Sequence, residues 1–418
     1  MDNKLIKTIS LPEHPENVPS LSLHVLAKNA ENVLARLLEN IRPFVQEFHF
    51  LLNDTDDSSE RVIRSMLTNG ETLYLQHVTS TSHPELYFPD ESYSYEVGLP
   101  LGNEKFTGPY THAPLLCDWA GTRNLGWESD CTWRLFLDAD DVVPLPGELP
   151  GLLVLLHNLG ADIAATKYLY GHGPGGAANS VSYRERLARN IHNLKWAGST
   201  HETLAGGLRN VLVEDRLSVV DMKDNWGRGV RVPGRCFKVL YREARMQSWQ
   251  VPPRHLAYLV QESGGMMSVD WVAHSLYRKY LDVATSAEEK AWVSCMIGEL
   301  YEAREEFLSA SRYYESALGQ YNSTKAAWRL CRARFMKGDY PGCTEAYEQG
   351  VALKDVPQVL DDGPVYADSS KLLAGQAFFE MGMCERALAL LEEAAKAFPT
   401  SGTVLALLDR MRQAKTIG

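Results

Sequence analysis

The hydrophobic pattern of this chain changes once, at Pro252-Pro253. Before that point short apolar runs alternate with amphipathic segments, and after it apolar residues recur every three or four positions. The first pattern is typical of strands alternating with helices, and the second of helices alone. The 418 residues are enough for two cores. We therefore predict an N-terminal extension (1–19), an α/β domain (20–250) and an all-α domain (251–418).

The α/β domain opens with a regular alternation. Residues 21–26, 47–52 and 72–77 are apolar runs with strand character, and residues 31–41 and 60–67 between them have helical spacing. This βαβαβ order predicts a mostly parallel central sheet, whose ligands bind beyond the carboxyl ends of the strands. Residues 132–137 and 162–170 add strands, whereas residues 80–111 are irregular and indicate a functional loop or an insertion.

The all-α domain contains a repeated frame. A turn residue is followed at five and twelve positions by small residues and at nine by a large one. The first two frames start 33 positions apart, close to the 34-residue tetratricopeptide period, and residues 354–364 read as a loop insertion before the third. A generic helical bundle is the alternative. The frames are Glu305, Ala310, Tyr314, Ala317; Gly338, Cys343, Tyr347, Gly350; and Gly382, Ala387, Leu391, Ala394.

Composition limits the cellular compartments and the classes of binding partner that we expect for this chain. The formal charge of -11 argues against a chain that coats nucleic acid by charge alone. Seven cysteines without a CxxC pair suit buried thiols in a reducing compartment. No apolar run approaches the length needed to span a bilayer, and no signal peptide is visible. We expect a cytoplasmic protein without a membrane span.

The strand at 132–137 ends in the most informative residues of the sequence, Asp138-Ala139-Asp140-Asp141. Alternate side chains of an extended strand point to the same side, so Asp138 and Asp140 can converge on one hard cation. Mg²⁺ and Mn²⁺ prefer carboxylate ligands and keep positions open for phosphate oxygens. The pattern favours a diphosphate substrate, although acidic pairs at strand ends are usually only solvated.

With its neighbouring motifs, this segment resembles the inverting family-2 glycosyltransferases of GT-A fold, in the branch with C-terminal tetratricopeptide repeats. The resemblance covers essentially the whole chain. It implies an α/β GT-A nucleotide-sugar-binding domain followed by a tetratricopeptide-like domain. It also implies Mn²⁺ or Mg²⁺ as cofactor and a nucleotide-sugar donor, with a UDP-sugar favoured.

Three motifs place donor-binding residues in this resemblance. The first strand leads into Lys28, Asn29 and Glu31, with Ala30 intruding in the family's Lys-Asn-Glu turn. After the second strand, Asp54 and Thr55 match the family's base-binding motif, but Asp56 replaces its glycine and Ser59 its final acid. Before the metal strand, Asp118, Arg123 and Asn124 match in order and spacing. The resemblance implies that these residues, with Asp138 and Ala139, bind the donor.

The last motif of the resemblance is Trp196-Ala197-Gly198-Ser199-Thr200-His201-Glu202. It implies His201 as a third metal ligand beside Asp138 and Asp140, and Glu202 as the general base. Asp141 and Asp215 compete for the base role. Alternatively, His201 caps a strand and Glu202 pairs with Arg184, Arg186 or Arg189. Asp221 stands where the family often has a further histidine.

The acceptor is poorly encoded. We expect sugar transfer with inversion to a protein, peptide or glycan hydroxyl, with the repeats presenting the acceptor. The segment from Arg184 to Arg245 holds thirteen basic against seven acidic residues. That excess leaves open a transferase acting on a hydroxymethylated DNA base, as in phage DNA modification. A non-catalytic adaptor that works through its repeats is the third hypothesis.

Overall fold

The structure is a computed structural model. It describes residues 4–6, 17–67, 70–87, 95–99, 102–106, 116, 118–172, 178–207, 209–221, 235–263, 267–353, 366–399 and 401–417. The chain divides into two compact units, Met1–Glu243 and Ala244–Gly418. The division falls inside helix α5 (Arg235–Met246), a few residues before the predicted boundary at 250. Each unit is described by itself.

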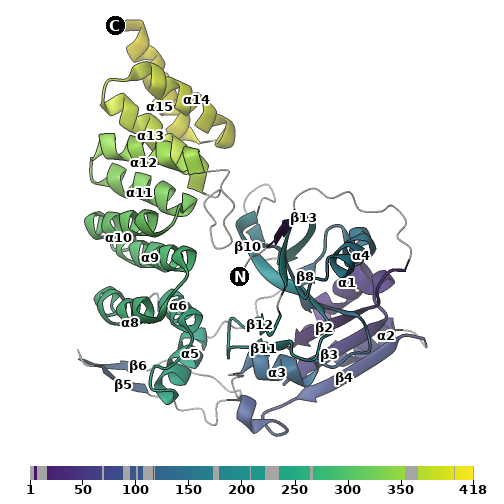
Figure 1. The fold of residues 1–418 in the computed structure, drawn as a ribbon. Coiled ribbons are helices and arrows are strands. Elements are labelled where there is room, and N and C mark those ends of the chain that lie inside the picture. Colours follow the sequence, from purple (N-terminus) through teal and green to yellow (C-terminus); the bar gives the residue numbers. More distant parts are fainter. Residues whose placement is uncertain are drawn as a thin grey trace. The chain divides into compact units, whose positions relative to one another are not determined.

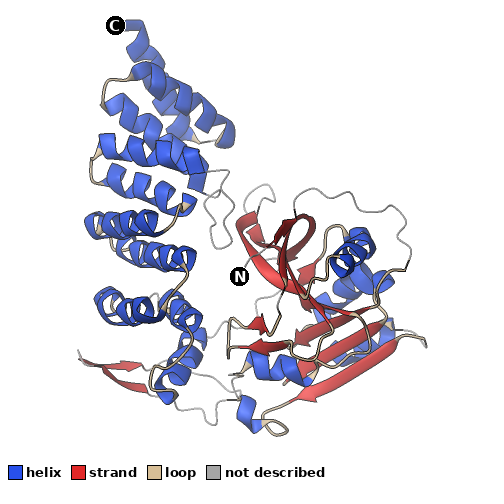
Figure 2. Cartoon of the chain, in the orientation of Figure 1, coloured by secondary structure: helices blue, strands red, loops and turns tan. Residues whose placement is uncertain are grey.

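The first unit is built on a mixed sheet with the order β1-β13-β9-β10-β7-β2-β3-β4 (Figures 1 and 2). Strands β7, β2, β3 and β4 are mutually parallel, as predicted, whereas β10 runs antiparallel to both β7 and β9. The sheet strands are β1 (Lys4–Ile6), β2 (Leu21–Ala27), β3 (Glu47–Asn53), β4 (Thr72–Val78), β7 (Trp133–Asp138), β8 (Asp141–Val142), β9 (Ile163–His172), β10 (Ala178–Arg189) and β13 (Asn210–Asp221).

Further elements complete the first unit. Two small sheets pair β5 (Tyr95–Leu99) with β6 (Gly102–Phe106) and β11 (Lys195–Ala197) with β12 (Thr203–Ala205). The helices are α1 (Glu31–Ile41), α2 (Ser59–Met66), α3 (Trp119–Leu125), α4 (Leu149–Asn158) and the short 3₁₀ turns Arg42–Phe44, Pro84–Leu86 and Pro146–Glu148.

Alternation along the strands gives the sheet two different faces. Leu23 of β2, Phe50 of β3 and Leu135 of β7 pack in one core with α1 and α4. Phe136 of β7 points to the other face, where it packs with Trp127, Trp196 and Ala120 of α3. Neighbouring side chains of a strand point to opposite faces of the sheet. The register of the paired strands therefore determines which side chains enter each of these two clusters. The second face, under α3 and β11, also carries polar side chains.

One prediction about the first unit is wrong, and a second is made more specific by the structure. Residues 1–19 were expected to be an extension outside the domain, but β1 adds to the sheet edge in parallel with β13, Lys4 opposite Val211. A three-residue run is too short to stand out as a strand by its apolar pattern. The irregular segment 80–111 contains the β5–β6 hairpin, which its Pro- and Gly-rich sequence did not predict.

The second unit is helical. Its helices are α6 (Pro253–Glu262), α7 (Val269–Trp271), a π-helical turn (Val272–Leu276), α8 (Tyr277–Val283), α9 (Ala287–Glu302), α10 (Phe307–Gln320), α11 (Thr324–Met336), α12 (Tyr340–Leu353), α13 (Ala367–Glu380), α14 (Cys384–Ala397) and α15 (Gly402–Ile417). Helices α9/α10, α11/α12 and α13/α14 form successive hairpins, stacked in chain order in Figure 1. The predicted insertion at 354–364 lies outside the described residues.

The predicted repeat frame accounts for the hairpins. Each frame begins at a left-handed turn residue, with φ of 60° at Glu305, 74° at Gly338 and 76° at Gly382. The small frame residue Ala310 is fully buried. At Gly298 an added Cβ would meet the Tyr314 ring at 2.5 Å, so the close approach of α9 and α10 requires a glycine there.

Within the described ranges, no helix has both the length and the apolar character needed to cross a lipid bilayer.

Candidate functional site

The candidate site lies at the carboxyl ends of the parallel strands. Asp138 ends β7, opposite Leu26 of β2, and Asp54 follows the last residue of β3. Strands β7 and β3 flank β2, so their ends lie roughly 10 Å apart. Two of the predicted motifs therefore share one edge of the sheet, as the βαβαβ reading requires.

Hydrogen bonds join the loops that follow β2 and β3. Asn29 Oδ1 accepts from the backbone N–H of Asp56 at 3.0 Å, and Glu31 Oε2 accepts from Ser58 N–H at 2.9 Å. In return, Glu31 N–H donates to Asp57 Oδ2 at 2.9 Å. The Asn29 and Glu31 side chains thus shape the loop that carries Asp54. Lys28 is exposed beside them.

Three predicted site residues have left-handed backbone conformations. The φ angles are 48° at Asn29, 40° at Asp54 and 52° at His201. Non-glycine residues rarely adopt such angles, and strain of this kind gathers at functional sites. Left-handed residues thus occur in three separate loops of the predicted site, which the residue spacing did not predict.

Asp54 and Thr55 carry polar atoms without protein partners. Asp54 Oδ2 and Thr55 Oγ1 are both buried and have no hydrogen bond. Burial raises the pKa of the nearby Tyr87 hydroxyl, and the Asp54 carboxylate as a whole raises it further. A buried polar atom without a partner costs about 1–3 kcal/mol, so such atoms usually meet a ligand or water. The pair offers one acceptor and one hydroxyl at the place where the family resemblance implies the nucleotide base.

Arg123 of α3 links two of the predicted acids. Its Nε donates to Glu202 Oε1 at 2.6 Å, and its Nη2 donates to Asp138 Oδ1 at 3.0 Å. Burial alone would lower the pKa of Arg123, but Glu202 and Asp138 together raise it. Glu202, the candidate base, therefore pairs with Arg123 and not with the arginines of β10 considered from the sequence.

Arg186 of β10 is a site residue that the motifs did not single out. Its Nη2 lies 3.6 Å from Asp138 Oδ2 and 3.3 Å from Asp141 Oδ2, and its guanidinium stacks on the Tyr168 ring. The antiparallel pairing of β10 with β7, in which Leu187 lies opposite Leu135, brings Arg186 near Asp138. Nothing in the sequence indicates this pairing, because a βαβ reading yields only parallel neighbours.

Asp141 is enclosed. Its side chain is fully buried, accepts from the Tyr168 hydroxyl at 2.7 Å and from the backbone N–H of Asp138 at 2.8 Å. Burial raises its pKa, against the pull of Arg186. These contacts hold the Asp138–Asp141 turn in shape. Asp215, the other rival base, lies in β13, and its side chain lies outside the described residues.

The predicted metal ligands do not form a group. The ligand atoms of Asp138, Asp140 and His201 do not all lie within 4.8 Å of one another. Both oxygens of Asp138 face guanidinium groups, and a divalent cation there would meet two like charges. As they lie, these three residues do not fit a shared ion. For Asp138, the ion pairs with Arg123 and Arg186 account for this.

Asp118 and Asn124 lie at the two ends of α3. Asp118 caps the helix by accepting from Gly121 N–H at 2.7 Å, and burial raises its pKa, with Glu243 and Glu202 adding to the rise. Asn124 donates to Trp196 O at 2.9 Å and accepts from Trp196 N–H at 3.0 Å. Both ends of the Asn124 amide are therefore engaged with β11, which gives Asn124 a positioning role. Its contact with the donor stays a prediction.

The remaining predictions have mixed outcomes. Ala139 is buried in the turn after β7, and the Asp140 carbonyl accepts from Arg36 of α1 at 3.0 Å. The structure describes only part of the basic segment, and two of its described basic residues are buried. Arg186 faces acids, Lys238 is buried, and residues 222–234 lie outside the described residues. Asp221 is buried at the end of β13, with its backbone opposite Asp141.

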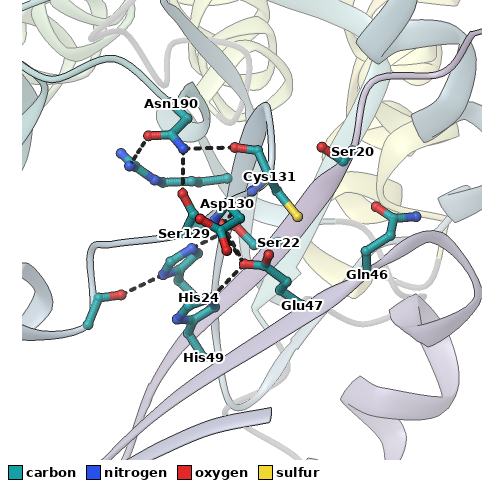
Figure 3. Close-up of polar contacts among 12 residues, drawn as sticks. Ser20, Ser22, His24, Gln46, Glu47, His49, Ser129, Asp130, Cys131 and Asn190 are labelled. Atoms are coloured by element: carbon teal, nitrogen blue, oxygen red, sulfur yellow. Dashed lines mark hydrogen bonds and ion pairs between the residues drawn. The ribbon is translucent and has the colours of Figure 1, made fainter. Parts of the chain in front are cut away.

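A second polar cluster surrounds His24, Glu47 and His49 (Figure 3), on the sheet face to which Phe136 points. The rings of His24 and His49, on neighbouring strands, stack 4.4 Å apart, and His49 stacks on Tyr74. Glu47 contacts His49 Nε2 at 3.2 Å and accepts from the Ser129 hydroxyl at 2.7 Å. The sequence does not indicate this cluster, because histidines inside apolar runs carry no motif.

Comparison with known proteins gives only distant likenesses. No family model matches the chain, and no curated protein sequence matches it. Among solved structures, MamA is 16% identical with a TM-score of 0.31, covering 38% of this chain and 85% of that one. YrrB, a TPR protein with an unusual peptide-binding site, is 13% identical with a TM-score of 0.34, covering 42% and 84%.

PilW, a widely conserved type IV pilus biogenesis factor, is 14% identical with a TM-score of 0.33, covering 43% of this chain and 76% of that one. Scores this low support no inference about activity. By its own structure the chain consists of a mixed α/β unit followed by a helical repeat unit, and its function has to be argued from the α/β site.

Proposed function

We propose that the first unit is an inverting glycosyltransferase that uses a nucleotide-sugar donor, with a protein, peptide or glycan hydroxyl as acceptor. The observation that carries the proposal is the buried, unpartnered pair Asp54 Oδ2 and Thr55 Oγ1 at the edge of the sheet where Asp138 ends β7. A nucleobase with an N–H donor and a carbonyl acceptor would satisfy both atoms.

The charged side chains at the same edge suit the chemistry. Displacement at the anomeric carbon leaves a nucleoside diphosphate that develops negative charge, and Arg123 is positioned to meet it. A base must also take the acceptor proton. Glu202 is our candidate, because its carboxylate is 13% exposed and is fixed by Arg123 next to Asp138.

Asp118 supports the sugar end of the proposal. It lies close enough to Glu202 for the two carboxylates to repel each other, and burial raises its pKa. A carboxylate in such a place accepts hydrogen bonds from sugar hydroxyls, which are neutral donors. The repeat unit is our proposed site for presenting the acceptor. Divalent-ion dependence stays a prediction of the sequence.

The proposal is tested by nucleotide release from a panel of UDP- and GDP-sugars, with and without Mn²⁺. The test variant is Asp54→Asn and its matched control is Asp56→Asn, an exposed acid two residues away. We expect Asp54→Asn to raise KM for the donor on the order of tenfold, about 1.4 kcal/mol, and Asp56→Asn to change it little. Equal behaviour of the two variants, or no release from any donor by the wild-type chain, would reject the proposal.

A further inference from the structure

Asp138 is shared by two buried guanidinium groups. Arg123 approaches Oδ1 at 3.0 Å and Arg186 approaches Oδ2 at 3.6 Å, from α3 and β10 respectively. The two arginine side chains are only 10% and 8% exposed. Arginine stays protonated in such surroundings, and its planar fork matches phosphate oxygens as well as carboxylates.

The three acids that hold these arginines differ in exposure. Glu202 on Arg123 is 13% exposed and Asp141 on Arg186 is not exposed at all, whereas Asp138 is 31% exposed. A ligand arriving from solvent reaches the Asp138 contacts first. If it displaces Asp138, Glu202 and Asp141 still hold the two guanidinium groups in place.

We infer that Arg123 and Arg186, and not a divalent ion, bind the diphosphate of the donor, and that Asp138 occupies their phosphate-binding positions until the donor arrives. This inference rests on the proposed function. It assigns Arg186 as a binding residue and reverses the role that the sequence suggests for Asp138. If Asp138 were a metal ligand, it would be needed for donor binding. If Asp138 instead occupies the phosphate-binding positions of the arginines, it competes with the donor.

The two possible roles of Asp138, metal ligand or competitor of the diphosphate, predict opposite effects of replacing it. Binding of UDP and of inorganic pyrophosphate to the full chain is measured by calorimetric titration in excess EDTA. The UDP titration is repeated with Mn²⁺. We expect UDP to bind equally well in both buffers. Asp138→Asn should bind UDP in EDTA as tightly as the wild type or up to about tenfold more tightly, because the competing charge is gone.

The arginine variants supply the second arm. Arg186→Gln should weaken both ligands on the order of tenfold or more in EDTA, and Arg186→Lys should recover part of the loss. Arg189→Gln, on the same strand but without a contact to Asp138 or Asp141 among the described ion pairs, is the control. Thermal unfolding of each variant shows whether it is folded.

The outcomes separate this inference from the proposed function. UDP binding that requires Mn²⁺ and is abolished in Asp138→Asn would overturn the inference and leave the glycosyltransferase proposal standing. Pyrophosphate and UDP binding in EDTA, combined with no release of nucleotide from any nucleotide sugar, would support the diphosphate site and reject the transferase. Absence of UDP and pyrophosphate binding in EDTA would overturn the inference.

Discussion

His24 and His49 are buried histidines whose protonation opposes folding, whereas the raised pKa of Asp141 acts in the opposite direction. Burial lowers the pKa of His24 well below its ordinary value, and the facing His49 lowers it further. Burial also lowers the pKa of His49, although Glu47 opposes the shift. Arg134 lies close to both rings and disfavours their protonation.

These shifts predict an acid-sensitive first unit. Unfolded histidines titrate near pH 6.5, so below that pH the unfolded chain binds more protons than the folded one. The free energy of unfolding should therefore decrease as the pH falls from about 7, by up to roughly 1.4 kcal/mol per pH unit for each histidine. Denaturant unfolding at pH 7.5 and 5.5 measures the difference.

The matched variants are His24→Gln and His77→Gln. The first removes a buried titrating group and should reduce the loss of stability between the two pH values, whereas the second replaces a histidine whose side chain is 46% exposed. If both variants lose as much stability as the wild type, the histidine pair does not control the acid response.

For single residues, the sequence predicted which residue types belong to the site better than it predicted which side chains contact each other. Asp54 and Asp138 do lie at the carboxyl ends of β3 and β7, the two strands that flank β2, because strand ends can be located from apolar runs. That Arg123 bridges Glu202 and Asp138, and that Arg186 joins them, depends on contacts between residues 79 and 48 positions apart. Spacing along the chain carries no information about such contacts.

At the scale of elements, α3 and β11 form the cover of the site. The Asn124 side chain binds both the N–H and the carbonyl of Trp196, and Trp119 N–H donates to Ser199 O at 2.8 Å. The loop from β11 to β12 carries His201 and Glu202. These backbone contacts therefore determine where Glu202 lies relative to Arg123.

Asn124→Ala should loosen this cover. Two hydrogen bonds to buried backbone are lost, so we expect destabilisation of about 1–3 kcal/mol and slower nucleotide release, with little change in donor KM. The control is Leu125→Ala on the same helix, where the side chain is 39% exposed. Urea unfolding and steady-state kinetics check both effects. A variant with wild-type stability would show that α3 and β11 are held by other contacts.

Helices and strands were predictable where apolar residues recur at a regular helix or strand spacing. The strands and helices from β2 to β4 were predicted within a residue or two, because each has an unbroken period and clear ends. β10 was missed, since its sequence has no apolar run and contains three consecutive charged residues, Arg184 to Arg186. Its antiparallel direction could not be derived from a βαβ reading, which yields only parallel neighbours.

At the scale of the whole molecule, the two units have separate hydrophobic cores. The first core packs around β2, β3 and β7, while the second unit is built from helix hairpins with buried small residues such as Ala310 and Ala317. The predicted division followed from the change in pattern at Pro252-Pro253. Its few-residue error arises because α5 is a helix that continues across the division.

This organisation predicts that strain introduced into one unit lowers the stability of that unit alone. Gly298→Ala brings a methyl group within 2.5 Å of the Tyr314 ring and should destabilise the helical unit by about 1–3 kcal/mol. Gly319→Ala, in the neighbouring helix, has nothing within 4 Å and should stabilise it by up to about 1 kcal/mol.

Hydrogen exchange read out by mass spectrometry distinguishes the two units in the intact chain. In Gly298→Ala, amides of α9 to α12 should exchange faster, while amides of β2, β3 and β7 should keep wild-type protection, because local opening follows the stability of the cooperative unit. Equal acceleration in both units would mean that they unfold as one. The repeat unit would then contribute to the stability of the candidate site as well as to our proposed presentation of the acceptor.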